Sequence, residues 1–551
     1  MWSKNKDKGH EEEKVLFSEY GTLYFMKGER YKAIFDSSEC EQCTMRILRI
    51  SRESFFIQVL ADFDGEESEV LIQPIGCGLS FGYSRKAGSV HWPAYMDGKL
   101  ESMAFVFSGE NSRMTPEDIT MRFVEIYNRC TYALLTSSDV DAITNEDEGY
   151  EYIGNSATSQ IPDEDYQEPV YELDVSHEAA TKTGGRNICY SESMKFNNAM
   201  VVRRAKDSVE LQTHKFDSYG FNEGTSGKVR IPGLTTCEDA LLDDTETKLQ
   251  LLSIDDQKLY EYDIDYGKVV QEHKLPEKVT AITYSAHVAD PVPVYTCLTD
   301  NVAFNVDCRM DPRKNIVMEP GCTLDKYRLT SLKKPFTCHA TTRDGHLVIG
   351  DMMGSIRLYR GPPGSRRKDG KYNPKAAQTL LETKVPIVAV DVTADGAYVV
   401  AVCEKFLLFM PTAYVDDRGE NTTGFVSKMG KKKPTPLKLQ PTSKQLAVLG
   451  GIEKLDFVSG GFDRYENGGR EVCITAYSGN YIFTWSLEAV KRAEENGRAC
   501  LGESALVRND VIGVSAHIPD KLMYLTDSDI CMAPLKLHER TERGSRRYAY
   551  L

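Results

Sequence analysis

The sequence lacks the features of a membrane-spanning or exported protein. It has no apolar run near the roughly 18 residues that a membrane-spanning helix requires. Residues 1–14 are highly charged and contain no apolar signal-peptide core. The 14 cysteines are scattered over 551 residues, and without a secretory signal they are interpreted as reduced thiols. We therefore expect a cytoplasmic protein without a transmembrane segment.

Catalytic and metal-binding motifs are also missing. We find no phosphate-binding glycine-rich loop, no G-x-S-x-G and no H-E-x-x-H. The 10 histidines are scattered. Cys40 and Cys43 form a close pair, but a zinc site would need a second pair of ligands at a suitable spacing. We expect no enzyme, no cofactor and no metal site.

Residues 14–135 are expected to form a small β-rich domain that ends in a helix. Short β-rich runs separated by turn signals precede the segment TPEDITMRFVEIYNRCTYALL. Thr115 is suited to cap this helix and Pro116 to its first position. Apolar residues such as Ile119, Phe123 and Tyr127 then recur at helical spacing. This order predicts a pleckstrin-homology-like (PH-like) β-barrel that the helix closes.

Residues 136–185 differ sharply in composition. No Lys or Arg occurs between Arg129 and Lys182, whereas Asp and Glu are frequent. Few apolar residues are available to offset the loss of chain entropy on folding, so we predict an acidic disordered linker. Its tyrosines leave two interpretations open, a solvating spacer or a docking and phosphorylation segment.

Residues 186–540 contain a repeat. Residues 336–359, FTCHATTRDGHLVIGDMMGSIRLY, align without a gap with residues 387–410, IVAVDVTADGAYVVAVCEKFLLFM. Asp344-Gly345 then matches Asp395-Gly396, and Asp-Gly favours a tight turn between two strands. Weaker copies lie at 199–216, 248–275, 278–306, 471–487 and 511–535. Four short strands per unit, at spacings of about 50–65 residues, predict a β-propeller with about seven blades.

Several stretches of this region resemble one family in the same order. They are LYEYDIDYGKVVQEHKL, RMDPRKNIV, the two repeat segments, KKPTPLKLQP and CITAYSGNYIFTWSL. The chain is therefore identified as similar to the Vid27 (vacuolar import and degradation protein 27) family. It departs from the family pattern at Met353-Gly354-Ser355 and at Arg360. The resemblance implies a WD40-like propeller, a PH-like domain, no established catalytic activity and a link to vacuolar import and degradation of cargo proteins.

The expected function is a non-enzymatic, protein-binding scaffold or adaptor, in which the linker sets the reach between the two domains. Proteins or peptides would bind one face of the propeller. Four residues in or beside the turns of one repeat are candidates for this contact: Arg343, Asp351, Arg357 and Tyr359. The alternative is recruitment to a membrane phosphoinositide through the PH-like domain. Three arginines are candidates for that contact with anionic lipid: Arg46, Arg49 and Arg52.

The chain has a net charge of −15 but contains three basic clusters. They lie at 364–371, 427–438 and 536–547, and the last continues into a basic C-terminal tail over 541–551. Each is interpreted as a solvated loop or tail, with contact to an acidic partner as the alternative. The lysines at 431–433 leave two further interpretations open, a nuclear-import signal or an anionic-lipid patch. Aromatic residues do not interleave with these cations, so specific nucleic-acid binding is not expected.

Overall fold

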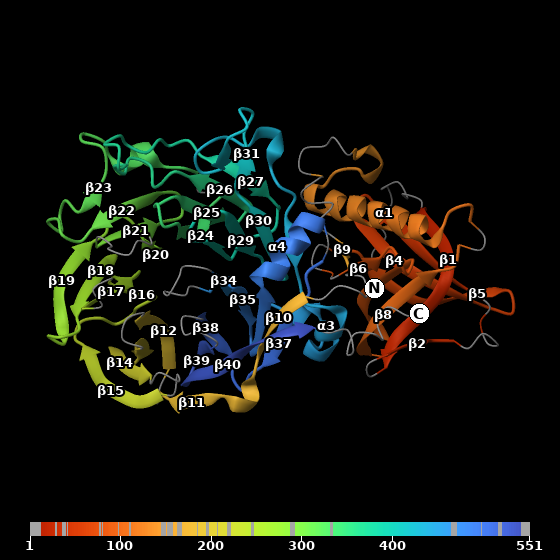
Figure 1. Ribbon diagram of the computed structural model, residues 1–551, viewed down its shortest axis with the longest axis horizontal. Helices are drawn as coiled ribbons and strands as arrows, with labels where there is room; N and C mark the ends of the chain where they lie inside the picture. The colour runs from red at the N-terminus through yellow and green to blue at the C-terminus, as the bar shows by residue number, and fades with distance from the viewer. Residues whose placement is uncertain are drawn as a thin grey trace, which may run out of the picture.

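The computed structural model shows a mainly β protein made of an N-terminal domain beside a seven-bladed propeller (Figure 1). It describes residues 13–540 with interruptions. Those outside the description are 1–12, 28–29, 36–39, 41, 77–78, 80, 97, 110–111, 145–149, 151–157, 162–167, 184–185, 194–197, 207, 217–221, 244–246, 287–292, 331–333, 464–470, 498, 516–520 and 541–551. The tail predicted over 541–551 thus lies outside the described residues.

The N-terminal domain is built on one strongly curved sheet. Its strands are β1 (Lys14–Lys27), β2 (Arg30–Ala33), β3 (Cys43–Ser51), β4 (Ser54–Phe63), β5 (Glu66–Pro74), β6 (Gly82–Ser84), β7 (Ser89–Met96) and β8 (Lys99–Phe107). The long β1 pairs with β3 over its first half and with β8 over its second. Gly21 lies at the change of partner, where an added Cβ would lie 2.1 Å from Val106 O. The absence of a side chain there lets the two halves approach closely.

Helix α1 (Pro116–Thr136) closes this half-barrel, as the sequence predicts. Thr115 accepts a hydrogen bond from the Asp118 N–H, and the Asp118 carboxylate accepts one from the Thr115 N–H. This reciprocal pair stabilises the first turn. Phe123 packs edge to face on Phe17 of β1, with the ring centroids 5.2 Å apart. The arrangement is consistent with the predicted PH-like fold.

The propeller consists of seven antiparallel sheets. Blade 1 has β12 (Arg186–Ser193), β13 (Asn198–Arg204), β14 (Val209–Phe216) and β15 (Asn222–Ile231); blade 2 has β16 (Asp239–Leu242), β17 (Lys248–Ser253), β18 (Lys258–Asp263) and β19 (Lys268–Lys274). Blade 3 has β20 (Ala281–Tyr284), β21 (Val294–Leu298), β22 (Ala303–Asp307) and β23 (Ile316–Val317); blade 4 has β24 (Phe336–Thr341), β25 (Leu347–Asp351), β26 (Ser355–Tyr359) and β27 (Gln378–Glu382).

The last three blades depart from this plan. Blade 5 has β28 (Ala389–Val392), β29 (Tyr398–Val402), β30 (Leu407–Pro411) and β33 (Leu437–Leu439), with a separate hairpin of β31 (Ala413–Val415) and β32 (Asn421–Thr423). Blade 6 has β34 (Ser459–Phe462), β35 (Cys473–Ser478), β36 (Tyr481–Ser486) and β37 (Glu503–Leu506), with helix α4 (Leu487–Asn496) before its last strand. Blade 7 has β38 (Val511–Ser515), β39 (Lys521–Thr526) and β40 (Asp529–Arg540). First strands lie around the centre and last strands at the rim (Figure 1).

The predicted repeat corresponds to blades 4 and 5. Gly345 and Gly396 occupy the matching turns with φ of +77° and +74°, a conformation that glycine adopts readily. Thr342 Oγ1 accepts the His346 N–H at 3.1 Å, and Thr393 Oγ1 accepts the Tyr398 N–H at 3.0 Å. The Asp-Gly turn itself is the same in both blades, since the Gly345 N–H donates to Thr342 O and the Gly396 N–H to Thr393 O, but the pair that closes it lies one residue later in blade 5.

The prediction of a disordered linker over 136–185 is corrected for part of its length. β10 (Glu168–Leu173) and β11 (Ala179–Lys182) pair with successive parts of β40 and form the outer edge of blade 7. The propeller thus joins an early segment to its last strand, and it begins before residue 186. An outer strand needs backbone hydrogen bonds and few buried side chains, so a polar segment can supply it. Leu173 is the buried anchor of β10.

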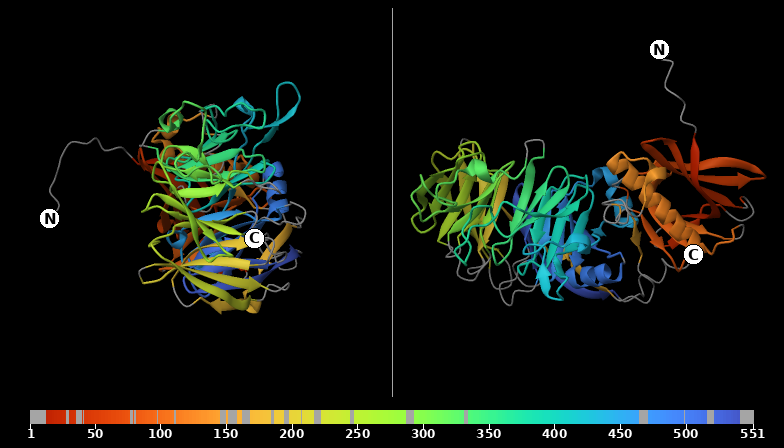
Figure 2. Two further views of the ribbon diagram at one scale, coloured as in Figure 1. Left: turned by 90° about the vertical axis from the view of Figure 1, so that its left-hand side faces the viewer. Right: turned by 90° about the horizontal axis from the view of Figure 1, so that it is seen from above.

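The two domains also contact each other directly, which a freely swinging tether would not produce. Helix α3 (Ser443–Leu449) lies between the propeller and the strands β7 and β8 (Figures 1 and 2). The Ser443 and Ser102 hydroxyls are 2.5 Å apart. The Ala499 N–H donates to Gln160 O at 2.7 Å, and Gln160 belongs to β9 (Ser159–Gln160), which extends the N-terminal sheet. The contact therefore couples the orientation of the N-terminal domain to blades 5 and 6.

Candidate functional site: a basic loop surface

Two long loops emerge from the same face of the propeller. Within an antiparallel blade, the connections between strands one and two and between strands three and four lie on one face. The loop 360–377 connects β26 to β27 in blade 4, and the loop 412–436 connects β30 to β33 in blade 5. The predicted cluster 364–371 lies within the first loop, and the cluster 427–438 lies in the second loop and ends in β33. Neighbouring blades therefore present both clusters on one side of the ring.

The blade 5 loop is anchored across blade 4. Phe425 is buried and stacks on His346, with the ring centroids 5.2 Å apart. Burial lowers the pKa of His346, which keeps the imidazole neutral in this contact. The Met429 N–H donates to Gln378 Oε1 at 2.8 Å, and the Arg360 guanidinium donates to Val426 O. These contacts hold the loop in place on the blades beneath it.

The blade 4 loop is held by its own polar contacts. The Asn373 amide donates to Ser365 Oγ at 3.0 Å, and the Ser365 hydroxyl donates to Pro362 O at 2.5 Å. At its exposed end, Lys368 Nζ lies 3.5 Å from Asp344 Oδ1 in the first turn of the same blade. The exposed end of the loop thus lies beside the turn that carries Arg343.

We call Arg343 together with residues 364–371 and 427–433 the basic loop surface. Its exposed cations are Arg343, Arg366, Lys368, Lys371, Lys428, Lys431 and Lys432. Acidic neighbours offset part of this charge, since Lys432 lies 2.8 Å from Asp417 and Arg367 lies 2.8 Å from Asp369. The remaining positive charge is carried by anchored loops, which suits it to an acidic ligand.

The third basic cluster lies elsewhere. Its first residues belong to the end of β40, where Lys536 pairs with Asp174 beside β10. Residues 541–547 lie outside the described part of the chain. This cluster is therefore not included in the basic loop surface.

The four predicted partner-binding residues do not form one patch. Arg343 is exposed in the turn before β25, whereas Asp351 is at the opposite end of that strand and 1% exposed. Asp351 Oδ1 accepts the N–H groups of Met353 and Ser355 at 2.9 and 2.8 Å. Asp351 therefore stabilises a turn inside the blade.

The other two predicted residues are also largely structural. Arg357 lies 3.3 Å from the Asp351 carboxylate, with its guanidinium 5.7 Å from the centre of the Phe336 ring. Tyr359 is 2% exposed and packs in the apolar cluster between blades 3 and 4. The prediction of a direct partner contact is corrected for Asp351 and Tyr359, because the fold buries both. Of the four, Arg343 is the one on the basic loop surface.

Two of the candidate lipid-binding arginines form ion pairs with acidic side chains. Arg46 donates to both carboxylate oxygens of Glu67 at 3.0 Å. Arg49 lies 3.0 Å from Asp139 and 3.2 Å from Asp141, just after α1. Arg52 is exposed nearby and lowers the pKa of Asp139 further, after the larger effects of the Asp141 N–H and of Arg49. Acidic neighbours therefore offset the charge that an anionic headgroup would require.

One cluster was not anticipated by the sequence. Glu261, His273 and Cys308 are buried together where blade 2 meets blade 3. They are far apart in sequence and belong to two blades, so no ligand spacing of a known metal motif marks them. Among the residues that the structure describes, these three side chains form a group whose ligand atoms are close enough to hold a metal ion.

Among the helices that the structure describes, none has the length and apolar character needed to cross a membrane.

Comparison with known proteins identifies the propeller region. Two curated relatives are named vacuolar import and degradation protein 27. The one from Schizosaccharomyces pombe is 28% identical over 244 residues, which cover 42% of this chain and 28% of the relative. The one from Saccharomyces cerevisiae is 23% identical over 243 residues, which cover 43% of this chain and 29% of the relative. The chain thus matches less than a third of the length of either relative.

A solved structure and a family model complete the comparison. The Cps50 (Swd1) β-propeller domain of Myceliophteria thermophila aligns at 12% identity with a TM-score of 0.43, covering 66% of this chain and 100% of that one. The model of the VID27 C-terminal WD40-like domain matches residues 193–501, which are more than half of the chain. The family resemblance drawn from six stretches of the sequence is confirmed, and the chain belongs to the VID27 family.

Proposed function

We propose that this protein is a non-enzymatic binding scaffold whose basic loop surface captures an acidic segment of a partner protein. The observation that carries the proposal is the gathering of exposed cations on two loops that are anchored across blades 4 and 5. Loops fixed on a rigid ring bind with little loss of conformational entropy. Their positive charge also contrasts with the chain's net charge of −15, which disfavours unselective binding of anions.

The family name suggests the process that this scaffold serves. Relatives named for vacuolar import and degradation support a role in the delivery of partner proteins to that pathway, from the cytoplasm. In this proposal the propeller holds the partner, and the docked N-terminal domain presents a second surface at a fixed orientation. The contacts of α3 with β7 and β8 supply that fixed orientation.

Recruitment to a membrane phosphoinositide has less support. Arg46 and Arg49 would have to exchange their carboxylate partners for a lipid headgroup, and surface ion pairs are broken at a cost of up to about 1 kcal/mol each. Membrane binding therefore remains an outcome of the test and is not part of the proposal.

The test measures binding of a fluorescent glutamate-rich peptide to the full chain. The triple variant Arg366→Glu/Lys368→Glu/Lys431→Glu should weaken binding by about tenfold or more, since it reverses three charges on the proposed surface. The binding constant of the wild type should also fall as salt rises.

A matched control reverses three exposed lysines on blades 1 and 2: Lys215→Glu, Lys268→Glu and Lys274→Glu. This control should stay within about twofold of the wild type, because screening removes most effects beyond the Debye length. Equal losses in both triple variants would overturn the proposed surface. Binding of the full chain to phosphoinositide vesicles, abolished by Arg46→Ala/Arg49→Ala, would favour the membrane alternative.

A further inference from the structure

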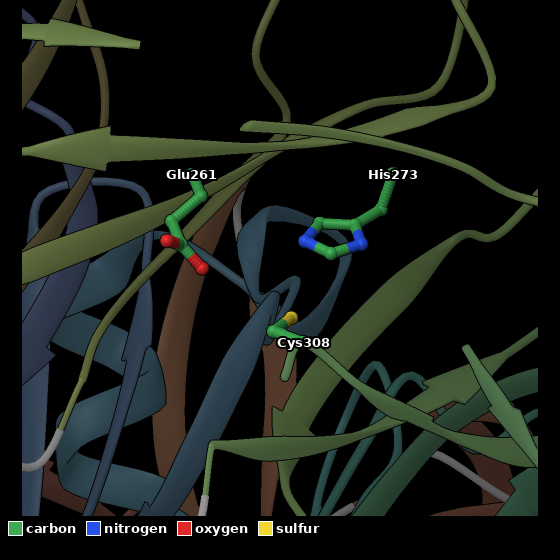
Figure 3. Close-up of side chains that lie close together, drawn as sticks. All are labelled: Glu261, His273 and Cys308. Carbon is green, nitrogen blue, oxygen red and sulfur yellow. The ribbon is translucent and has the colours of Figure 1, made fainter. Parts of the chain in front are cut away.

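Three side chains that can bind a metal converge between blades 2 and 3 (Figure 3). Glu261 lies on β18, His273 on β19, and Cys308 directly follows β22. Their ligand atoms all lie within 4.8 Å of one another, and Figure 3 shows the carboxylate, imidazole and thiol directed toward a common space. This cluster lies away from the basic loop surface, which is built on blades 4 and 5.

Strand pairing explains why blade 2 directs polar groups toward blade 3. Glu261 pairs with Gln250 on one side and Gln271 on the other, while Leu259 pairs with His273. Because side chains alternate along a strand, Glu261 and His273 fall on the same face of the blade. That face packs on blade 3, where the Cys308 N–H donates to Pro293 O at 3.0 Å and fixes the thiol at the strand end.

Apolar side chains pack around this cluster, beside the three polar residues that contact it, Lys248, Gln250 and Asn315. Cys308 belongs to the buried cluster that includes Leu252 and Leu259 from blade 2 and Phe304 from blade 3. Glu261 is 3% exposed and His273 is 0% exposed. Polar groups buried this deeply are normally satisfied by a partner. An unsatisfied one therefore requires an explanation.

His273 is the unsatisfied group. Its Nε2 is buried without a hydrogen-bond partner, while its Nδ1 lies 3.0 Å from Asn315 Nδ2. The amide oxygen and nitrogen of an asparagine exchange places when the group is flipped. Asn315 can then accept a hydrogen bond from Nδ1–H, which leaves a lone pair on Nε2. Metal-ligating histidines commonly have this arrangement, with the second nitrogen held by a hydrogen bond.

Burial also keeps this imidazole in the form that a metal requires. Desolvation lowers the pKa of His273, so the ring is neutral at neutral pH. Only the neutral ring offers a lone pair to a metal ion. Burial also raises the pKa of the Cys308 thiol to about 12, so a metal ion that binds there displaces the thiol proton.

The hydrogen bonds of Glu261 and Cys308 leave ligand atoms available on both side chains. Lys248 Nζ lies 2.5 Å from Glu261 Oε1, whereas Oε2 has a long contact of 3.4 Å to Gln250 Nε2. The Cys308 thiol has a contact of 3.9 Å to Gln250 Oε1. The ion pair with Lys248 therefore satisfies Oε1 of Glu261. Oε2 of Glu261, the Cys308 thiol and the His273 imidazole are left facing each other.

We propose that Glu261 Oε2, His273 Nε2 and Cys308 Sγ bind one zinc ion that joins blade 2 to blade 3. A thiolate, an imidazole and a carboxylate together suit a metal of borderline softness, and zinc accepts all three in tetrahedral sites. Gln250 Oε1 or a water molecule takes the fourth position. Ligands of tetrahedral zinc lie roughly 3.3–3.8 Å apart, so side-chain rotations that draw these atoms about 1 Å closer complete the site.

The experiment uses the purified full chain, its metal content and its binding of Co²⁺. Elemental analysis of wild-type protein prepared without chelator should give about one zinc per chain. After removal of that metal, Co²⁺ alone should produce the thiolate charge-transfer absorption of a Co²⁺–cysteine bond, and Zn²⁺ should abolish it. Folded wild-type protein that holds no zinc and gives no such absorption would overturn the proposal.

Variants identify the ligands. Cys308→Ala should remove the Co²⁺–thiolate absorption, and His273→Gln and Glu261→Gln should each weaken Zn²⁺ binding by about tenfold or more. The matched controls are Cys338→Ala, another buried thiol, and His339→Gln, a buried histidine whose Nδ1 also lacks a partner. Both controls should keep one zinc per chain.

The test remains decisive even if one of the ligand variants misfolds. If Cys308→Ala does not fold, His273→Gln and Glu261→Gln test the same site by metal content and by Zn²⁺ competition. Loss of zinc in a folded control variant, or full zinc content in a folded His273→Gln variant, would contradict the assignment. Failure here leaves the binding of acidic peptides on blades 4 and 5 untouched, since the two sites share no residue.

Discussion

Two blade interfaces in this propeller differ in the side chains that two neighbouring strands direct toward the next blade. In blade 4, Val348 and Leu358 pair across β25 and β26 on the face toward blade 5. In blade 2, Gln250 and Glu261 pair in the same way across β17 and β18 on the face toward blade 3. One interface is filled with hydrocarbon where the other holds an amide and a carboxylate.

The difference shows what each interface needs. Burial of apolar surface stabilises the blade 4–5 contact in the chain alone. Buried polar groups are favourable only when partners satisfy them, and His273 Nε2 in blade 2 has none. The blade 4–5 interface is thus self-sufficient, whereas the blade 2–3 interface gains stability from an added ligand.

The largest expected effect is from breaking the apolar interface. Leu358→Ala removes a side chain that is 1% exposed in the cluster between blades 4 and 5. Lost burial and the resulting cavity should lower the free energy of unfolding by about 2–5 kcal/mol. Urea unfolding measures the change. The loss should be the same with zinc or with a chelator, and a chelator-dependent loss would mean that the two interfaces are not independent.

A smaller effect is expected when the polar interface is made to resemble the apolar one. The triple variant Gln250→Val/Glu261→Leu/His273→Leu should match or exceed the stability of the metal-free wild type by up to about 4 kcal/mol, because well-packed apolar groups often replace buried charges without loss. Urea unfolding in chelator measures this comparison.

Zinc separates that triple variant from the wild type. Zinc at about 100 times its dissociation constant should stabilise the wild type by about 2.7 kcal/mol and leave the triple variant unchanged. A triple variant that unfolds readily in chelator would contradict the view that the polar groups serve a ligand. It would assign them to the Lys248–Glu261 ion pair instead.

The sequence allowed the fold to be predicted wherever local patterns determine the structure. The capped helix after Thr115 and the Asp-Gly turns of blades 4 and 5 depend on neighbouring residues, and both formed as expected. β10 and β11 were not predicted, because these outer strands are held by backbone hydrogen bonds to β40, which is far away in sequence. Composition alone made that polar segment look disordered.

The candidate sites depended on distances that the sequence does not contain. Arg343 and Asp351 are close in sequence, yet a strand of five residues places them at opposite ends of β25. Glu261 and Cys308 are far apart in sequence, yet neighbouring blades bring them together. A repeat predicts that blades exist, but it does not predict which polar side chains meet between them.

The smallest expected effects compare two predicted partner-binding residues of blade 4. Asp351→Ala should lower the free energy of unfolding by about 1–3 kcal/mol, because the N–H groups of Met353 and Ser355 lose their acceptor. Arg343→Ala should change it by less than about 0.5 kcal/mol, because the side chain is exposed. Binding of the glutamate-rich peptide should respond in the opposite order, with a loss of about two- to fivefold for Arg343→Ala alone. If folded Asp351→Ala lost peptide binding while Arg343→Ala kept it, the ligand would contact the opposite face of the propeller, and the basic loop surface would not be the site.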